Sequence, residues 1–581
     1  MTQGAWNLVW TELTEVVAAA LSSAGMYSDQ RLGRLELAIP RDASHGDWTT
    51  NLALLLSKEL GRPPRVIAES LRDAMALDGT PFDRVEVAGP GFLNFTYRDD
   101  FIARFPERII MAGTSFGHSN QGNGERILVE YVSANPTGPL NVVSARAAAV
   151  GATLVRLLAA TGFDAEGEFY VNDAGNQVDL LGESVAARFA EAHGSARPFP
   201  EHGYRGEYVR EVAASLPEPE ARAALERPDG ATWFRDQALT RMLAGQRQDL
   251  GDYGAEFARW FPESTLHESG AVLNTLKELE SRGVLYCAVH PESGYERDED
   301  APAAVEAAPA TWLRASRFGD SQDRVVVRSN GAPTYLLPDT AYHRDKRSRG
   351  FRTAINLWGP DHHAYIKTLA AALRALGVED DFLEVLIVQQ VNLMRSGKTL
   401  DMSKRMGQFI TLRELMDDVG ADGAKFFFLM RSTSAHLDFD MDLAKQQSDE
   451  NPAFYVQYAH ARIASVICYA AERGVLPAAT ATLGYAAPEE RALIRKLAAY
   501  PEIVRGAAAM REPHRVPTYL VETAAEFHRF YHACRVVSED AALSRDRLLL
   551  AGAARVVLSN GLALMGVSAP ERMERETESM A

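Results

Sequence analysis

The sequence predicts an α/β domain built on a parallel sheet, preceded by a smaller α+β unit and followed by a helical bundle. Residues 126–172 read as strand, turn, helix and strand, which is the order of a βαβ unit with parallel strands. From residue 451 to about residue 566 the apolar spacing is helical, without a strand signal. At 581 residues the chain is too long for one core, so three or four domains are expected.

The first unit is expected over residues 1–115. Residues 5–25 carry apolar side chains at helical spacing, and residues 35–75 alternate a strand, a turn and two helices. The strand pair DRVEVAGPGFLNFTY turns through Gly89-Pro90-Gly91 and closes the unit. The Gly- and Asn-rich stretch FGHSNQGNGE (116–125) is expected to be a linker.

The parallel-sheet domain is expected over residues 126–445. The strands RILVEYV (126–132) and GEFYVN (167–172) enclose a helix of about residues 144–160, which ends at Gly162. The apolar stripe of this helix consists of Val150, Leu154, Leu157 and Leu158. Residues 180–310 read as a polar, mostly helical insertion, after which RVVVRS, AINLWG and LEVLIVQQV complete the sheet. Residues 446–581 then form the helical domain, with a polar, frayed end.

Composition narrows the class of protein. A net charge of −17 argues against a protein that coats nucleic acid nonspecifically, although one basic face can still bind RNA. Three widely spaced cysteines (Cys287, Cys468 and Cys534) predict neither a disulfide framework nor a zinc site, so no bound structural metal is expected. The start, MTQGAWNLVWTEL, has no basic stretch followed by an apolar core, so a signal peptide is not expected, and no apolar run is expected to reach the length of a membrane-spanning helix. We therefore expect a cytoplasmic protein without a membrane partner.

The stretch YVSANPTGPLNVVSAR (131–146) is the junction between the first strand and helix of the βαβ unit. Pro136, Gly138 and Pro139 force an irregular turn before the helix begins. Such a junction presents free N–H groups and the positive end of the helix dipole to an anion. On spacing alone, an ordinary turn of any α/β fold is the favoured interpretation.

The literal string SANPTGPL resembles the segment that leads into the first signature, His-x-Gly-His, of class I aminoacyl-tRNA synthetases in their arginyl form. The resemblance continues, in the family's order, through these stretches: HGDWTTNLA, VEVAGPGFLNF, EFYVNDAGNQV, WGPDHHAY, MSKRMGQFITLRELMDDVGAD, NPAFYVQYAHARIASV and GVSAPERM. The chain is therefore identified as a member of the arginyl-tRNA synthetase family.

The resemblance implies a Rossmann-type catalytic domain with insertions, an added N-terminal α+β domain that contacts the tRNA elbow, and a helical anticodon-binding domain. It implies that ATP, used with Mg²⁺, is a substrate that activates L-arginine to arginyl-adenylate. The arginyl group then passes to the 3′-terminal adenosine of arginine tRNA. A monomer is the family expectation.

An arginine pocket can be argued from charge. A guanidinium group is planar and permanently charged, and a carboxylate that accepts two parallel hydrogen bonds holds it best. In TYLLPDTAYHRDK (334–346), Tyr335 and Asp339 match the family residues that hold this group, while Glu130 and Asn135 match residues at the substrate's amino end. The alternatives are that backbone donors satisfy Glu130 and that Tyr335 is a core aromatic.

The ATP site departs from the family pattern, because the His-x-Gly-His positions read Asn141, Val142, Val143 and Ser144. The valine side chain at 143 is expected to intrude where adenine lies on bare backbone. Each lost imidazole removes a transition-state donor, a loss of about 2.7–4 kcal/mol in comparable sites. Asn141 keeps an N–H donor, Ser144 keeps a hydroxyl, and the helix dipole is retained.

The second signature is better preserved. DMSKRMG (401–407) resembles the Lys-Met-Ser-Lys loop, with Asp401 at its first lysine and Lys404 at its second. Met402, Ser403 and Lys404 are expected at the ATP, with Lys404 stabilising the leaving diphosphate. The alternative is a solvated turn.

His362 and His363 match residues that line the nucleotide site in the family. A structural histidine pair is the alternative, and zinc is not implied because no matching ligands follow.

In the C-terminal region, NPAFYVQYAHAR places Tyr455, Tyr458 and Arg462 at helical spacing. These three side chains can stack on and hydrogen-bond splayed anticodon bases, as recognition of single-stranded RNA requires. For Tyr455, a core aromatic that joins this helix to the catalytic domain is an equal alternative.

Two functions follow. The first is an arginine–tRNA ligase, which includes a duplicate enzyme reshaped to evade an inhibitor that mimics a substrate. The second is a catalytically impaired paralogue that binds arginine or tRNA in a regulatory role. The pocket residues and Lys404 favour the ligase, whereas Asn141, Val143 and Ser144 favour the paralogue. On balance the sequence favours the ligase.

Overall fold

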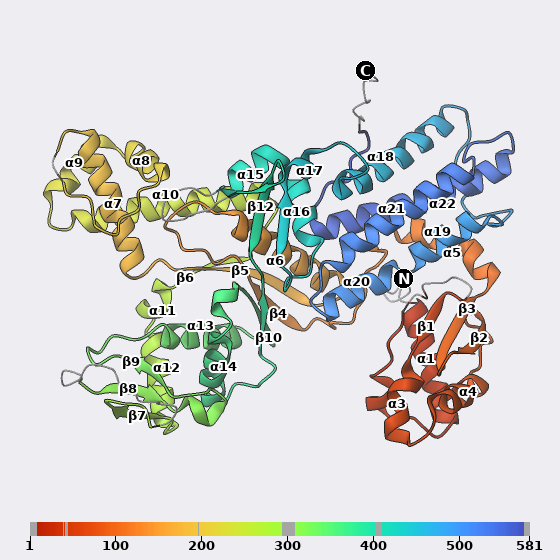
Figure 1. Cartoon of the computed structure of the whole chain (residues 1–581), viewed down its shortest axis with the longest axis horizontal. Helices are drawn as coiled ribbons and strands as arrows, with labels where there is room; N and C mark the ends of the chain where they lie inside the picture. Colours follow the sequence, from red (N-terminus) through yellow and green to blue (C-terminus); the bar gives the residue numbers. More distant parts are fainter. Residues whose placement is uncertain are drawn as a thin grey trace.

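The protein is described from a computed structural model that covers residues 8–38, 40, 45–195, 197–292, 308–400 and 410–573. In Figure 1 the N-terminal unit lies at the lower right and the C-terminal helices run along the upper right. The parallel sheet occupies the middle, and its insertions extend to the left. The predicted combination of an α/β domain with an α+β unit and a helical bundle is confirmed.

The N-terminal unit is a three-stranded antiparallel sheet, in the order β1-β3-β2, covered by helices. The predicted strand pair is β2 and β3, and its turn requires glycine at position 91. There φ is +142°, and an added Cβ would lie 2.8 Å from the backbone carbonyl carbon of Pro64. The elements are α1 (Leu8–Ser23), α2 (Asp29–Leu32), β1 (Trp48–Thr50), α3 (Leu52–Leu60), α4 (Pro64–Ala74), β2 (Phe82–Ala88), β3 (Phe92–Tyr97), α5 (Asp99–Ala112) and η2 (Gly113–Ser115).

The central sheet has five parallel strands in the order β11-β10-β4-β5-β6. The predicted βαβ unit is β4, α6 and β5, and the four residues of the predicted apolar stripe on α6 are all buried. The helix begins two residues earlier than expected. The elements are β4 (Arg126–Glu130), α6 (Val142–Ala160), β5 (Asp164–Val171), β6 (Arg259–Pro262), β10 (Thr353–Trp358), α14 (Tyr365–Ala375) and β11 (Leu383–Ile387).

Two insertions interrupt this sheet. The first, between β5 and β6, is helical: α7 (Asn176–Ala192), α8 (Glu207–Ala214), α9 (Glu218–Glu226) and α10 (Gly230–Asp252). The second, between β6 and β10, holds an antiparallel sheet and its helices: α11 (Ser264–Glu268), α12 (Ala271–Ser281), β7 (Leu285–Ala288), β8 (Ala310–Leu313), η3 (Ala315–Phe318), β9 (Arg324–Val327) and α13 (Leu336–Ser348).

The expectation for residues 180–310 and for RVVVRS is therefore partly wrong. Strands β6 and β7 lie inside the range that was read as helical, and RVVVRS forms β9 of the separate sheet. Each of these strands has only four residues, which is too short for a two-residue period to stand out from its surroundings.

A third small sheet, in the order β13-β12-β14, follows the central one. Its elements are β12 (Val391–Arg395), β13 (Lys398–Thr399), α15 (Leu412–Val419), α16 (Ala421–Leu429), β14 (Leu437–Asp440) and α17 (Met441–Lys445). The C-terminal part is helical, as predicted: α18 (Pro452–Ala471), α19 (Pro488–Ala498), α20 (Tyr500–Ala509), α21 (Arg515–Ala533) and α22 (Ala541–Met565).

Helices α6 and α22 are long and apolar enough to cross a membrane, by length and composition alone. The expectation that no apolar run reaches that length is therefore wrong. In each helix 67% of the most apolar window is buried inside the protein. Helix α6 packs against β4 and β5 on one side and against α20 and α22 on the other, and a helix surrounded in this way is apolar on all faces.

Candidate functional site

The centre of the parallel sheet is a topological switch point. Strand β4 leads through α6 to β5 on one side of the sheet, while the neighbouring strand β10 leads through α14 to β11 on the other side. In open parallel sheets, ligands bind in the crevice beyond the carboxyl ends of the two strands at such a point. The segments that follow β4 and β10 are therefore where a substrate site is expected.

The turn after β4 is strained. Val132 and Ser133 have φ values of +67° and +39°, in the left-handed region that side chains other than glycine rarely adopt. The Ser133 hydroxyl donates to Glu130 Oε1 at 3.1 Å and accepts the Tyr170 N–H at 3.0 Å. The strained turn is thus bonded to the ends of both β4 and β5, which fixes the direction in which Glu130 points.

The start of α6 is capped by its own residue. Asn141 Oδ1 accepts the N–H groups of Val143 and Ser144, both at 3.1 Å. The expectation of free N–H groups at this helix end is therefore wrong for these two, because an N-cap side chain satisfies them. Since the amide oxygen faces the helix, the Asn141 Nδ2 group points away and can donate to a ligand. The side chains of Val143 and Ser144 are partly exposed beside it.

The second signature lies outside the described residues, so Asp401, Met402, Ser403 and Lys404 cannot be placed. The residues that follow it can be placed. Thr411 forms an antiparallel bridge with Asn141, and the Leu412 N–H donates to the Leu140 carbonyl at 2.8 Å. The end of the loop segment is thus attached to the start of α6.

His362 and His363 follow β10, His362 as the last residue of the short turn η4 (Pro360–His362) and His363 directly after it, and both are exposed. His362 Nε2 lies 3.5 Å from Asp361 Oδ2, and its ring lies 5.9 Å from that of Trp358. Both histidines therefore stand at the same edge of the sheet as the start of α6, where a nucleotide can reach them.

A cavity of about 480 Å³ opens beside this edge. Tyr335, which precedes α13, lines it and is 76% exposed, so the core-aromatic alternative for Tyr335 is wrong. The full lining is Asn172, Ala174, Gly175, Asn176, Gln177, Glu263, His267, Arg328, Pro333, Thr334, Tyr335 and Pro338.

Carboxylates and phenols near the cavity have shifted pKa values. Burial raises the pKa of Glu263, against the opposite pull of His267 and Tyr170. Burial, followed by the charges of Glu263 and Asp339, raises the pKa of Tyr170, and burial followed by Asp339 does the same for Tyr365. Two carboxylates beside phenols that stay protonated form a site for a cation with several N–H donors.

Asp339 lies one helical turn beyond Tyr335, and its side chain is 26% exposed. Its charge and that of Glu263 both raise the pKa of Tyr170, although Asp339 itself does not line the cavity. Sequence reasoning missed Glu263, Tyr170 and Tyr365. Glu263 directly follows β6, Tyr170 lies near the end of β5 and Tyr365 begins α14, so only the fold brings them near Asp339.

Glu130 is 8% exposed, at the end of β4. Its Oε2 accepts the Lys346 ammonium at 2.5 Å, so its partners are side chains rather than the backbone donors of the alternative interpretation. Asn135 is exposed and donates through Nδ2 to Gln177 Oε1, at 2.8 Å, on the cavity wall. Of the two residues predicted for the amino end of a substrate, Asn135 is therefore bonded to the cavity wall, while Glu130 is buried at the end of β4 and does not line the cavity.

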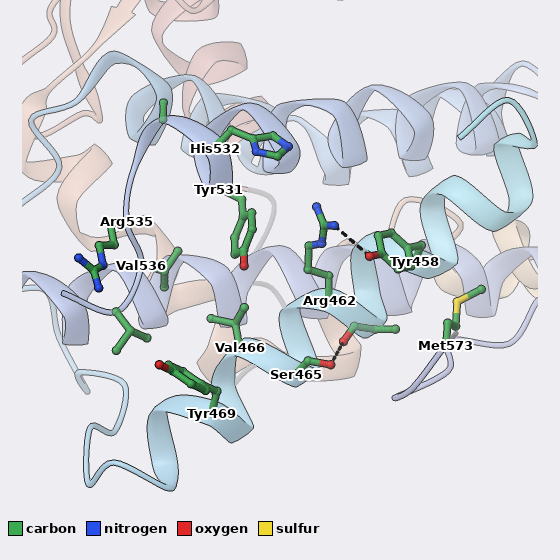
Figure 2. Close-up of a pocket in the computed structure, with 13 residues that line it drawn as sticks. Tyr458, Arg462, Ser465, Val466, Tyr469, Tyr531, His532, Arg535, Val536 and Met573 are labelled. Atoms are coloured by element: carbon green, nitrogen blue, oxygen red, sulfur yellow. Dashed lines mark hydrogen bonds between the residues drawn. The ribbon is translucent and has the colours of Figure 1, made fainter. Parts of the chain in front are cut away.

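A second cavity, of about 840 Å³, lies between α18 and the end of α21. Figure 2 shows Tyr531 reaching from α21 toward α18, where Arg462 points at Tyr458. The Arg462 guanidinium donates to the Tyr458 hydroxyl at 2.9 Å and lies 4.7 Å from that ring and 5.2 Å from the ring of Tyr531. Aromatic rings beside a guanidinium suit an unstacked base.

Of the three residues predicted for RNA, Tyr458 and Arg462 line this cavity. Tyr455 does not; it is partly buried against the core, and its ring lies 5.0 Å from that of His528. The packing interpretation of Tyr455 therefore describes its surroundings better. Four further aromatic and basic residues of the cavity were missed: Tyr469, Tyr531, His532 and Arg535.

Comparison with known proteins decides the family. Residues 11–97 match the arginyl tRNA synthetase N terminal domain, and residues 456–573 match the DALR anticodon binding domain. The arginine–tRNA ligase of Geobacillus kaustophilus is 42% identical over 567 residues, which are 97% of this chain and 98% of the relative. The chain belongs to the arginyl-tRNA synthetases.

Other synthetases agree over similar lengths. The arginine–tRNA ligase of Bacillus subtilis is 40% identical over 97% of this chain and 98% of its own. The solved arginyl-tRNA synthetase of Thermus thermophilus has a TM-score of 0.75 and 22% identity, covering 97% of this chain and all of that one, which is a likeness of fold.

Within this synthetase, the start of α6 is the unusual part. The cavity wall, the strained turn and the attachment of the loop segment are all present around it, while the signature imidazoles and glycine are not. No group of three or more His, Cys, Asp or Glu side chains arranged for a metal ion occurs in the part of the chain that the structure describes.

Proposed function

We propose that the chain is an arginine–tRNA ligase. It joins L-arginine to the α-phosphate of ATP, releasing diphosphate, and then transfers the arginyl group to the 3′-terminal adenosine of arginine tRNA, releasing AMP. The observation that carries this proposal is a pair of carboxylates beside the switch point, Glu263 on the cavity wall and Asp339 on α13, whose charges both act on the Tyr170 phenol. The reaction is the one that the arginyl-tRNA synthetase family catalyses.

For L-arginine, Asp339 and Glu263 receive the guanidinium group, with the exposed ring of Tyr335 at its face. A guanidinium offers five N–H donors in one plane, so two carboxylates and a phenol can be satisfied together. Glu130 and Asn135 hold the amino end. Glu130 is available for this role because each carboxylate oxygen accepts more than one hydrogen bond, beyond those from Lys346 and Ser133.

For ATP, which enters with its Mg²⁺ as a substrate, the site is the start of α6 together with its surroundings. Asn141 donates through Nδ2 to a phosphate oxygen, and Ser144 offers its hydroxyl. Val143 occupies the adenine side, and His362 and His363 line the edge after β10. Met402, Ser403 and Lys404 belong to the loop segment, and Lys404 balances the charge of the departing diphosphate.

For tRNA, the cavity between α18 and α21 receives an anticodon base, with Tyr458 and Arg462 as the contacts and Tyr455 supporting them from the core side. The N-terminal unit contacts the tRNA elbow. We further propose that the chain acts as a monomer in the cytoplasm.

The proposal is tested by transfer of labelled arginine to arginine tRNA. We expect ATP-dependent label at the 3′ end of the tRNA, released by mild alkali as an ester should be. Labelled lysine should give none, and Asp339→Asn should reduce the yield at limiting arginine. Transfer of lysine as readily as arginine would overturn the assignment of the substrate.

A further inference from the structure

Three side chains of α13 share one face of that helix. Asp339, His343 and Lys346 stand at positions i, i+4 and i+7, which brings them into line along a helix. His343 and Lys346 are both 0% exposed. The arginine site described above accounts for Asp339 but gives no role to the two buried groups behind it.

His343 bonds to Asp339 on one side of its ring. Its Nδ1 lies 2.9 Å from the Asp339 carbonyl oxygen and 3.2 Å from Asp339 Oδ1. On the other side, Nε2 lies 2.9 Å from Asn356 Nδ2 and 3.5 Å from Lys346 Nζ. Because an ammonium group can only donate, Nε2 is the acceptor, and Nδ1 carries the proton that it donates to Asp339.

Lys346 continues the chain to the second carboxylate. Its ammonium donates to Glu130 Oε2 at 2.5 Å and to Asn356 Oδ1 at 3.0 Å, and it lies 4.2 Å from the centre of the Tyr342 ring. Asn356 is 1% exposed and pairs across the sheet with Glu130. A line of contacts thus runs without a break from Asp339 through His343 and Lys346 to Glu130. At Asp339 the hydrogen bond is to the main-chain carbonyl, and the carboxylate Oδ1 lies 3.2 Å from the same ring nitrogen.

We propose that His343 and Lys346 are positioning residues that couple the two ends of the arginine site. This inference rests on the proposed function, in which Asp339 meets the guanidinium group and Glu130 meets the amino end. Through the buried line, occupation of Asp339 by a guanidinium holds Glu130 in the orientation that the amino group needs, and the reverse also holds.

The physical reason is that every member of the line is fixed by its neighbours. A buried ammonium group cannot turn away from Glu130 without losing its ionic partner in a site with little water, which is costly. A neutral imidazole with a donor on one side and an acceptor on the other transmits any shift of Asp339 to Asn356 and Lys346. A ligand that contacts both ends should therefore bind cooperatively.

A double-mutant cycle on arginine binding measures this coupling. Asp339→Asn, Glu130→Gln and the double variant are compared with the unmodified full chain by calorimetry. We expect the product of the two single losses of affinity to exceed the loss of the double variant by about fivefold or more. If the loss of affinity in the double variant equals the product of the two single losses to within about twofold, the proposal is contradicted.

Two substitutions at His343 provide matched controls. His343→Asn places an amide nitrogen near the Nδ1 position and keeps the donor to Asp339 but loses the acceptor for Lys346. His343→Gln keeps an acceptor near the Nε2 position but loses the donor. In each variant the coupling between Asp339 and Glu130 should fall below about twofold, whatever the variant itself does to arginine affinity. Unchanged coupling in both variants would show that the line does not carry it.

A second measurement keeps the inference independent of arginine binding. In the unliganded chain labelled with ¹⁵N-histidine, the His343 ring should show a protonated Nδ1 and a bare Nε2. Glu130→Gln should shift these signals, whereas Asp345→Asn, on the same helix and paired with Arg349 at 2.8 Å, should not. If the shift appears but arginine does not bind, the proposed substrate is wrong and the coupling stands. If arginine binds and no shift appears, the coupling is wrong.

Discussion

Thr411, two residues after the segment 401–409, pairs in an antiparallel bridge with Asn141, the cap of α6. The same Asn141 side chain holds the first turn of α6 through two N–H groups. A change at Asn141 therefore acts on the end of the helix and on its contact with Thr411, and in the proposed function it also acts on the phosphate of ATP. Asn141 thus has three roles, at a position where the family has a histidine.

Asp339→Asn should weaken arginine binding by about 1.5–3 kcal/mol, because it removes one charge-assisted hydrogen-bond partner of the guanidinium group. Calorimetry should detect L-arginine at micromolar to millimolar affinity in the unmodified chain. L-Lysine should bind far more weakly, since its point charge cannot use two carboxylates in one plane. Equal affinities for lysine and arginine would remove the pocket assignment.

Much of the fold follows from local pattern. The βαβ unit, the stripe on α6 and the C-terminal helices were predictable because their periods run over many residues. Strands β6, β7 and β9 were not, because four residues give no clear period. An asparagine directly before a helix is a sequence signal for a cap. The helix was expected to begin at about residue 144, so Asn141 did not stand directly before it and the cap was not predicted.

The site was predictable only where the family string names a residue. Tyr335 and Asp339 come from one motif at the start of α13; Tyr335 lines the cavity, and the charge of Asp339 acts on the Tyr170 phenol. Glu263 lies 76 positions earlier in the numbering and joins them only because β6 lies at the edge of the sheet. Lys346 was quoted in the motif, yet its contact with Glu130 spans 216 residues.

Arg462→Ala and Tyr458→Ala should each weaken binding of arginine tRNA by about 1–3 kcal/mol, the usual value of one stacked base. Binding should also fall as salt rises, because a net-acidic protein holds RNA through a local basic face. Fluorescence anisotropy with labelled tRNA measures both effects. The control is Arg515→Ala. Arg515 begins α21, at the opposite end of this helix from the cavity, and pairs with Glu512, so the variant should bind tRNA normally.

Point variants suit this test better than a deletion of residues 451–581. Helices α20 and α22 pack on α6, so such a truncation would expose the core beside the active site. If both pocket variants bind arginine tRNA like the unmodified chain, the cavity in Figure 2 is not the anticodon site.

Asp320→Asn should destabilise the second insertion at neutral pH and lose its effect in acid. Burial raises the pKa of Asp320, but hydrogen bonds from Arg324, Thr368 and the Ser321 N–H outweigh it and lower the pKa to about 2. Because the folded pKa is depressed, this stabilisation is present above pH 4 or so and disappears as the pH falls toward 2. Thermal unfolding of both proteins across pH 2–7 measures this. If the difference in stability between the unmodified chain and the variant did not change with pH, the prediction would be contradicted.

Val143→Gly alone should mainly improve ATP affinity. The valine side chain crowds the adenine in the ground state and the transition state alike, so its removal lowers KM with little change in kcat. Steady-state charging kinetics at varied ATP measure the two constants separately. A rise in kcat without a change in KM would show that position 143 affects the chemical step instead.

We infer that an otherwise complete ligase is slowed by three residues at the start of α6. Restoring the signature with Asn141→His, Val143→Gly and Ser144→His supplies two imidazole donors and releases the N–H groups that Asn141 now holds. The lost cap should reduce stability by only about 1 kcal/mol.

The measurement is the rate of charging arginine tRNA with radiolabelled arginine, compared between the unmodified chain and this triple variant. We predict slow charging by the unmodified chain and a gain of at least about a hundredfold in the variant, the scale of one recovered donor. Equal rates in the two proteins, whether both fast or both absent, would contradict the account.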